Sequence, residues 1–317
     1  MKKRVITAIV LLAVLIPAVY LGGLYFLAVG IFLSVVASYE MMSMFYTKSP
    51  TLKNYRYVVP TFSGFIVLFI YFAATRGLTP DILNDQILGS GDLITNLLYH
   101  FWVNIVFVAA IIICLGALVF TKNSTAHDMM AVITTLCYCG LIMGYVISIE
   151  YIEPVGFSDY IDNKLFGGRS IAYLFTVTMI TDTAAFLFGS KYGKHQLAPT
   201  ISPKKSVEGA IAGLVFGTVF GVIAAFLFQM LSFKETANLG TRIGVVAIVA
   251  LVSLILSSTV QIGDLVCSKL KRSYEIKDFG KIFPGHGGVL DRFDSFIFAG
   301  ATFYVIVQFV QLVILGA

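Results

Sequence analysis

Two aspartates near the C-terminus, Asp291 and Asp294, have the spacing of a small metal site. They lie three residues apart, so a helix would place both on one face. Two carboxylates that close repel each other unless a cation lies between them. Oxygen ligands suit Mg²⁺, which takes one or two carboxylates and completes its shell with water and phosphate oxygens. The pair therefore predicts a magnesium site completed by a phosphorylated substrate. A second cation is left open.

A glycine-rich segment containing His286, Gly287 and Gly288 precedes this pair. Glycines free backbone N–H groups to face an anion, and the positive end of the helix that follows favours phosphate. We therefore expect a phosphate group to bind here. A lone histidine in a loop is more often structural or phosphate-facing than a metal ligand, so His286 is not assigned to the metal.

Asp264 lies at the end of another apolar run. If the helix continues, Ser268, Lys271 and Arg272 follow on about one face. A stop-transfer cluster would explain the cations but not the acid one turn deeper.

Asp182 lies within an apolar run, where a carboxylate costs about 2.5–3.5 kcal/mol. A structural hydrogen bond to a neighbouring helix is the alternative for Asp182, but acids inside membrane segments favour a functional role for both positions.

Two glutamates, Glu40 and Glu150, lie nearer the ends of their apolar runs. For these we predict snorkelling or an interfacial position rather than function.

The basic loop between residues 191 and 208 is the second segment of interest. Ser202 and Pro203 fit the N-cap and first position of the next helix, and Lys204 and Lys205 follow where a polyphosphate could rest. A basic inner loop is also an ordinary consequence of membrane topology, so this loop alone does not decide for phosphate binding.

The elements that must position these residues are membrane helices. Of the 317 residues, 58% are hydrophobic and 12% are charged, whereas soluble domains carry roughly twice that charged fraction. A span needs about 20 mostly apolar residues. Nine such runs occur, at residues 5–21, 23–46, 57–75, 101–120, 131–151, 171–190, 209–231, 243–265 and 296–315. We predict an all-α, polytopic integral membrane protein with about nine transmembrane helices, forming one membrane domain over residues 1–317.

The charged residues predict how the chain is oriented. With the N-terminus inside, 17 of the 22 lysines and arginines fall on the inner side, as expected for cytoplasmic loops. Both motif segments then face the cytoplasm, and the C-terminus lies outside. The run from residue 209 has glycine at 209, 213, 217 and 221, a small-residue stripe that predicts a helix-packing face.

These residues together resemble the phosphatidate cytidylyltransferase (CDP-diacylglycerol synthase) family. The C-terminal signature of that family is matched by Ser268, Lys271, Arg272, Lys277, Asp278, His286, Gly287, Gly288, Asp291, Arg292 and Asp294. A second stretch is matched by Thr181, Asp182, Thr183, Gly189, Gly193, Lys194, Pro199, Ser202 to Ser206, Glu208 and Gly209. Many relatives have tyrosine at the position of Phe186 and threonine at that of Ser206. The motifs fall within residues 171–295.

The resemblance implies transfer of the cytidylyl group of CTP to phosphatidic acid, giving CDP-diacylglycerol and pyrophosphate. Mg²⁺ is expected at Asp264, Asp291 and Asp294, with Asp182 as a fourth catalytic candidate. The expected substrate-binding residues are Ser202, Lys204, Lys205, Ser268, Lys271, Arg272, Lys277, His286, Gly287, Gly288 and Arg292. We expect a multi-pass protein of the cell inner (plasma) membrane with its active site on the cytoplasmic side.

Two other functions are considered. A related enzyme could phosphorylate a polyprenol with CTP or cytidylylate another lipid phosphate, although the complete C-terminal signature favours phosphatidic acid. A secondary transporter could place Asp182 and Asp264 on an ion path, but this does not explain glycine-rich loops and paired aspartates on one side. The expected partners are CTP, phosphatidic acid and the lipid bilayer, with no nucleic acid, and homodimerisation is left open.

Overall fold

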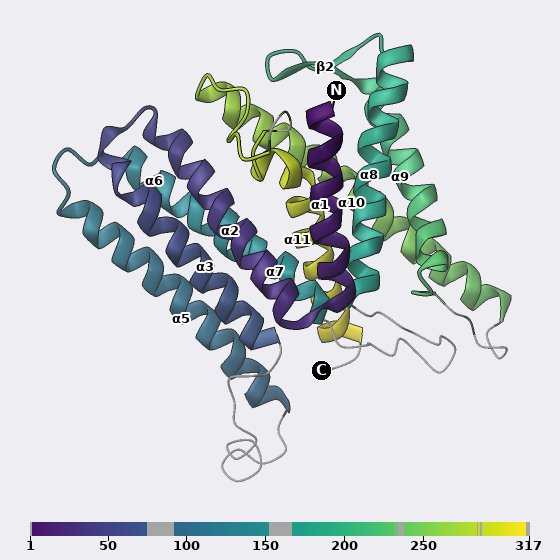
Figure 1. Ribbon diagram of the computed structural model, residues 1–317. Helices are drawn as coiled ribbons and strands as arrows, with labels where there is room; N and C mark the ends of the chain where they lie inside the picture. The colour runs from purple at the N-terminus through teal and green to yellow at the C-terminus, as the bar shows by residue number, and fades with distance from the viewer. Residues whose placement is uncertain are drawn as a thin grey trace. The chain divides into compact units, whose positions relative to one another are not determined.

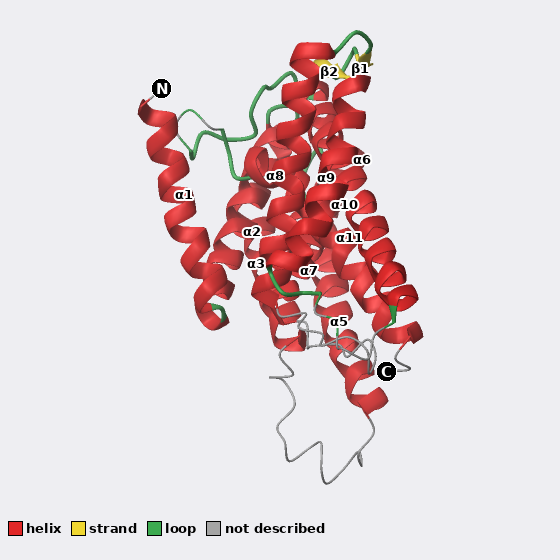
Figure 2. Cartoon of the chain, turned by 90° about the vertical axis from the view of Figure 1, so that its right-hand side faces the viewer, coloured by secondary structure: helices red, strands yellow, loops and turns green. Residues whose placement is uncertain are grey.

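The chain is almost entirely helical in a computed structural model, which describes residues 2–74, 92–151, 167–231, 233, 238–283, 285 and 287–314 (Figures 1 and 2). The described residues form two compact units. One comprises the chain up to Tyr151 together with Tyr274–Arg292, and the other comprises the chain from residue 167 to Ser273 together with the segment from Phe293 onward. The single membrane domain expected from the sequence stays a prediction.

The first unit is built from helices that follow one another along the chain. It contains α1 (Lys2–Leu21), α2 (Gly23–Tyr46), η1 (Pro50–Lys53), α3 (Tyr55–Ala74), α5 (Asp92–Val119), α6 (Ala126–Thr135), η2 (Leu136–Ile142), α7 (Met143–Ser148) and η3 (Ile149–Tyr151). The α2, α3 and α5 helices pack side by side (Figure 1). The η2 segment is a π-helical stretch between α6 and α7.

Small residues allow these helices to approach closely. Gly64 of α3 faces the side chain of Val35, and Gly144 of α7 faces Ile70. Buried Ser34 of α2 donates a hydrogen bond to the backbone oxygen of Cys139 at 2.6 Å. A hydroxyl that bonds a carbonyl in the same apolar core needs no water, so this contact is suited to a membrane interior.

The second unit contains the motif-bearing segments. It consists of α8 (Gly167–Tyr192), β1 (Gln196–Ala198), β2 (Ser202–Ser206), α9 (Val207–Leu227), α10 (Leu239–Ser273) and most of α11 (Leu290–Ile314). The two strands form an antiparallel hairpin beside the ends of α8 and α9 (Figure 2). The sequence reasoning did not foresee this hairpin, whose strands are only three and five residues long.

The glycine stripe of α9 packs against α8 and α10. Gly209, Gly213, Gly217 and Gly221 are all buried. A Cβ atom at any of them would meet atoms of α8, α10 or the helix's own cap at 3.0 Å or less. The prediction of a packing face is therefore confirmed, and close approach of these helices requires glycine there.

Seven of the described helical segments are long and apolar enough to cross a membrane. A shorter apolar helix, Val103–Val119, lies within α5. These features support an all-α membrane protein, while the count of nine spans stays a prediction. Several boundaries differ from the predicted apolar runs: α5 begins at Asp92, α10 continues to Ser273 and α11 begins at Leu290. At the last two of these helix ends, charged residues lower the hydropathy but do not interrupt the helix.

Candidate active site

Three helices of the second unit each contribute one aspartate to a group in which Asp182 lies within electrostatic range of the other two. Asp182 lies on α8, Asp264 on α10 and Asp294 in the second turn of α11. Asp182 is exposed, lies within electrostatic range of the other two carboxylates and of Lys205, and accepts a hydrogen bond from the Ser295 side chain. We call these three residues the aspartate cluster. It joins residues of both motif segments, and Asp182 and Asp264 are 82 residues apart along the chain.

Asp264 is held by two polar side chains. Its Oδ2 forms an ion pair with the ammonium group of Lys205, and its Oδ1 accepts a hydrogen bond from Ser268 at 3.2 Å. The Ser268 contact follows from the four-residue spacing that the sequence predicted for a continuing helix. The side chains of Lys205 and Asp264 are 27% and 31% exposed, so a soluble anion can still approach the pair.

A close helix contact brings Asp294 beside Asp264. Gly263 is buried, and a Cβ atom there would lie 2.9 Å from the backbone oxygen of Asp294 and 2.9 Å from Cβ of Phe298. Glycine at this position therefore allows α11 to approach α10 at the level of the acids. The ring of Phe296 on α11 lies 5.4 Å from that of Phe175 on α8, which extends the contact to the third helix.

The hairpin directs its two lysines differently. Successive strand residues point to opposite faces, and Lys205 reaches Asp264 while Lys204 is exposed. Glu208 closes the hairpin, because its carboxylate accepts hydrogen bonds from the backbone N–H groups of Lys194 at 3.0 Å and His195 at 3.3 Å. The His195 ring lies 2.6 Å from the same carboxylate through Nδ1. The hairpin thus fixes the position from which Lys205 extends.

The predicted helix start at Ser202 and Pro203 is wrong. Both residues belong to β2, and α9 begins at Val207. The N-cap is Ser206, whose hydroxyl accepts a hydrogen bond from the Gly209 N–H at 3.1 Å. The serine followed by an acid in the first turn is the better N-terminal signal, and the sequence reasoning overlooked it.

The remaining predicted cations are divided between the two units. Lys271 is half-buried and Arg272 is exposed in the last turn of α10, about two turns beyond Asp264. Lys277 and Arg292 are exposed residues of the first unit. Their roles as substrate-binding residues stay predictions.

Asp291 binds the backbone of the glycine-rich loop. Its Oδ2 accepts hydrogen bonds from the N–H groups of Phe279 at 2.8 Å and Gly288 at 2.9 Å. Gly287 has a φ of +86°, and a Cβ atom there would lie 2.8 Å from the same oxygen. Asp291 therefore shapes this loop, and its role as a metal ligand stays a prediction. The predicted residue His286 lies outside the described residues.

The comparisons with known proteins decide the family. A model of the cytidylyltransferase family matches residues 2–310. The chain belongs to the cytidylyltransferase family. A phosphatidate cytidylyltransferase of Staphylococcus haemolyticus (strain JCSC1435) is 30% identical to it over 298 residues, which are 94% of this chain and 95% of the relative. A phosphatidate cytidylyltransferase of Staphylococcus aureus (strain COL) is 32% identical over 305 residues, with the same coverage.

The donor atoms of this cytidylyltransferase family member are compatible with a hard metal ion. Every side chain of the aspartate cluster offers carboxylate oxygens, and three acids with one paired lysine leave net negative charge. Within the part of the chain that is described, no three histidine, cysteine or acidic side chains lie close enough to bind a metal by themselves. Substrate oxygens or water would therefore complete the coordination shell.

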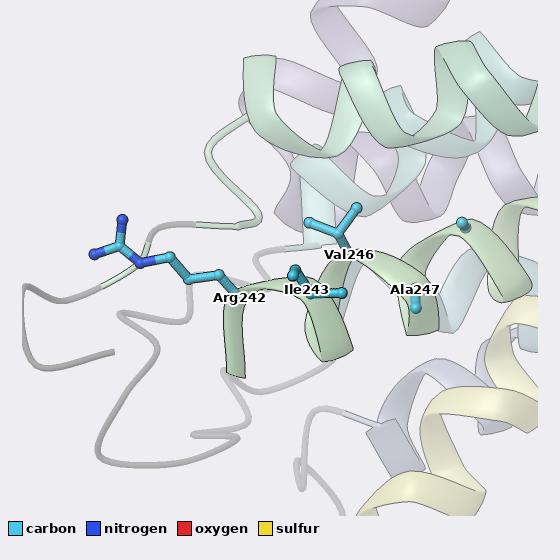
Figure 3. Close-up of a pocket in the computed structure, with 5 residues that line it drawn as sticks. Arg242, Ile243, Val246 and Ala247 are labelled. Atoms are coloured by element: carbon cyan, nitrogen blue, oxygen red, sulfur yellow. The ribbon is translucent and has the colours of Figure 1, made fainter. Parts of the chain in front are cut away.

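A surface pocket on α10 lies away from these acids. It is lined by Arg242, Ile243, Val246, Ala247 and Ala250, near the start of the helix (Figure 3). Ala250 precedes Asp264 by 14 residues, or about 21 Å along a helix. The pocket has no carboxylate in its lining and is not the candidate active site.

Sequence reasoning missed Glu40, and its predicted snorkelling position is wrong. Glu40 is 4% exposed, and its carboxylate oxygens accept hydrogen bonds from the N–H groups of Val289 at 3.0 Å and Leu290 at 3.1 Å. The anion at the start of this helix is thus a carboxylate of the protein itself. The available signal was an acid within an apolar helix that has no cation one turn away.

Proposed function

We propose that this chain transfers the cytidylyl group of CTP to phosphatidic acid, forming CDP-diacylglycerol and releasing pyrophosphate. The observation that supports this most directly is the aspartate cluster with its paired Lys205, in a chain whose relatives are named phosphatidate cytidylyltransferase. An acidic centre that holds a lysine suits a reaction between two phosphate compounds, because cation binding and phosphate binding must occur side by side.

In this reaction an oxygen of the lipid phosphate attacks the α-phosphorus of CTP. The bond from that phosphorus to the bridging oxygen breaks, and the electron pair leaves with pyrophosphate. The lipid phosphate is already deprotonated at neutral pH, so no side chain has to remove a proton. The task of the protein is to bring two anions together and to stabilise the charge that develops on the leaving group.

Lys205 is suited to this task because its ammonium group is fixed by the hairpin and by Asp264 yet stays partly exposed. Lys204 in β2, and Lys271 and Arg272 in the last turn of α10, add positive charge that would offset the repulsion between the two substrates. Serine hydroxyls and backbone amides of the same region would orient the phosphates.

We propose Mg²⁺ as the cofactor. Asp264 and Asp294 would hold it, with Asp182 beside them, and the sequence-based prediction adds Asp291 one helical turn before Asp294. When bound, the ion neutralises phosphate charge and orients the triphosphate. Asp264 would then interact with both Lys205 and the ion, so its ion pair with Lys205 would weaken as the nucleotide binds.

We infer that the protein lies in the plasma membrane with its active site on the cytoplasmic side. The distribution of lysine and arginine supports this orientation. CTP is a soluble cytoplasmic nucleotide, whereas phosphatidic acid stays in the bilayer because each exposed CH₂ group costs about 0.8 kcal/mol. A site at the inner membrane surface serves both substrates.

The proposal is tested with the purified chain in lipid vesicles and CTP labelled at either the α- or the γ-phosphorus. Cytidylyl transfer predicts label in lipid from α-labelled CTP only, with equal amounts of pyrophosphate released, and only when phosphatidic acid and Mg²⁺ are present. Lipid labelling from the γ-phosphorus would indicate a kinase instead. No labelling from either nucleotide in protein that is folded would refute the proposed function.

A further inference from the structure

The buried carboxylate of Glu40 supplies the N-cap of a helix that lies about 250 residues further along the chain. The first N–H groups of any helix have no acceptor within that helix. Val289 stands directly before α11, and its apolar side chain cannot accept a hydrogen bond. Glu40 of α2 binds the Val289 and Leu290 N–H groups instead. Its carboxyl group also lies at the positive end of the helix dipole, which favours the ionised form.

The surrounding backbone fits closely around this carboxylate. A Cβ atom at either Gly280 or Gly288 would overlap the Glu40 side chain. Neither glycine has the positive φ that would by itself require glycine. The absence of a side chain at both positions is therefore explained by the space that Glu40 occupies.

Glu40 and Asp291 divide three consecutive amides between them. The Gly288 N–H donates to Asp291, and the next two N–H groups donate to Glu40. The hydrogen bonds of the two carboxylates thus hold the end of the glycine-rich loop and the first turn of α11. This turn contains Asp291, and Asp294 follows one turn later on the same helix.

We propose that Glu40 is a positioning residue, which fixes the first turn of α11 and thereby the directions of Asp291 and Asp294. It contacts backbone amides rather than substrate, so its effect on the reaction passes through those two aspartates. This inference rests on the proposed function, because it assigns Glu40 to the reaction that these aspartates serve.

The test uses Glu40→Gln in the full-length protein in vesicles, with Glu150→Gln as the matched control. Glutamine keeps the size of the side chain but points an NH₂ group at one of the two N–H donors, so that hydrogen bond is lost. We expect kcat to fall at least tenfold, with little change in KM for phosphatidic acid. Hydrogen exchange of the Val289 and Leu290 amides should accelerate at least tenfold. Glu150→Gln, which changes a half-buried glutamate of η3, should alter neither quantity.

A double substitution tests the contact itself. Because the Gly288→Ala methyl group and the Glu40 carboxylate compete for one space, Glu40→Ala combined with Gly288→Ala should be no less active than Gly288→Ala alone. Multiplicative losses would show that the two positions act independently, and they would contradict the proposal.

The exchange measurement separates this inference from the proposed function. If wild-type protein transfers no cytidylyl group, the function fails, while the exchange rates of the two amides still decide the role of Glu40. Wild-type exchange in Glu40→Gln would overturn the inference. A lower melting temperature with wild-type kcat in the folded protein would also overturn it, because Glu40 would then stabilise the fold without positioning the aspartates.

Discussion

Replacing Lys205 with alanine removes the cation paired with Asp264. Asp264 then loses its ion-pair partner, Asp182 loses a nearby positive charge, and the substrate phosphates lose an ammonium group held by the hairpin. We expect the effect on catalysis to be much larger than the effect on stability.

The two magnitudes follow from the exposure of the pair. Because about a third of each side chain is exposed, solvent screens the ion pair, which should contribute about 0.2–1 kcal/mol to the free energy of unfolding. The melting temperature should therefore fall by no more than about 4 °C. Loss of a fixed donor to developing negative charge typically costs about 2.7–4 kcal/mol, so kcat/KM for CTP should fall roughly 10²- to 10³-fold.

Initial rates with α-labelled CTP and the melting temperature are measured on the same vesicle preparation. Lys204→Ala is the matched control, because Lys204 is adjacent in β2 but exposed and has no ion pair among the contacts described. It should lower kcat/KM less than tenfold. Equal losses for the two variants would refute the assignment of Lys205, as would a large loss of stability with unchanged kinetics.

Asp264→Asn and Asp294→Asn should each reduce Mg²⁺-dependent turnover by more than a hundredfold while the protein stays folded. Near-normal rates in both variants would contradict the assignment of a metal to this site. Gly217→Ala should lower the free energy of unfolding by about 1–3 kcal/mol, because the added methyl group clashes with two hydroxyl groups. Gly116→Ala, which has open space around it, should not destabilise the protein, and equal denaturation midpoints for the two variants would contradict this prediction. Cysteine tags near Lys194 and at the C-terminus, in a cysteine-free background, should react from opposite sides of the membrane. Labelling from one side would overturn the predicted topology.

The fold was predictable where apolar runs define helices and less so at their polar ends. Hydropathy ends α10 near Leu265, but lysine and arginine are good helix formers and the helix continues to Ser273. The β1–β2 hairpin has no strong pattern of its own. It depends on Glu208 bonding the backbone of Lys194 and His195, which only the folded chain brings together.

The site was predictable where its contacts are local. The contact between Ser268 and Asp264 follows from helical spacing, and the acidic motifs were visible in the sequence. The meeting of Asp182 with Asp294 requires tertiary packing, which no spacing within one helix encodes. Glu40 was misjudged because the sequence shows an acid without a nearby cation but does not show its partners, which are backbone amides that every residue except proline possesses.

The length of α10 makes the position of Asp264 depend on the thickness of the bilayer. Ile243 and Asp264 are 21 residues apart on one continuous helix, or about 32 Å, and a typical hydrocarbon core is about 30 Å thick. This stretch of helix is therefore about as long as the hydrocarbon core is thick. In thicker bilayers the turn of α10 that bears Asp264 would be drawn toward hydrocarbon, away from water-soluble nucleotide and metal ion. Turnover should therefore depend on the acyl-chain length of the host lipids, even when these lipids are not substrates.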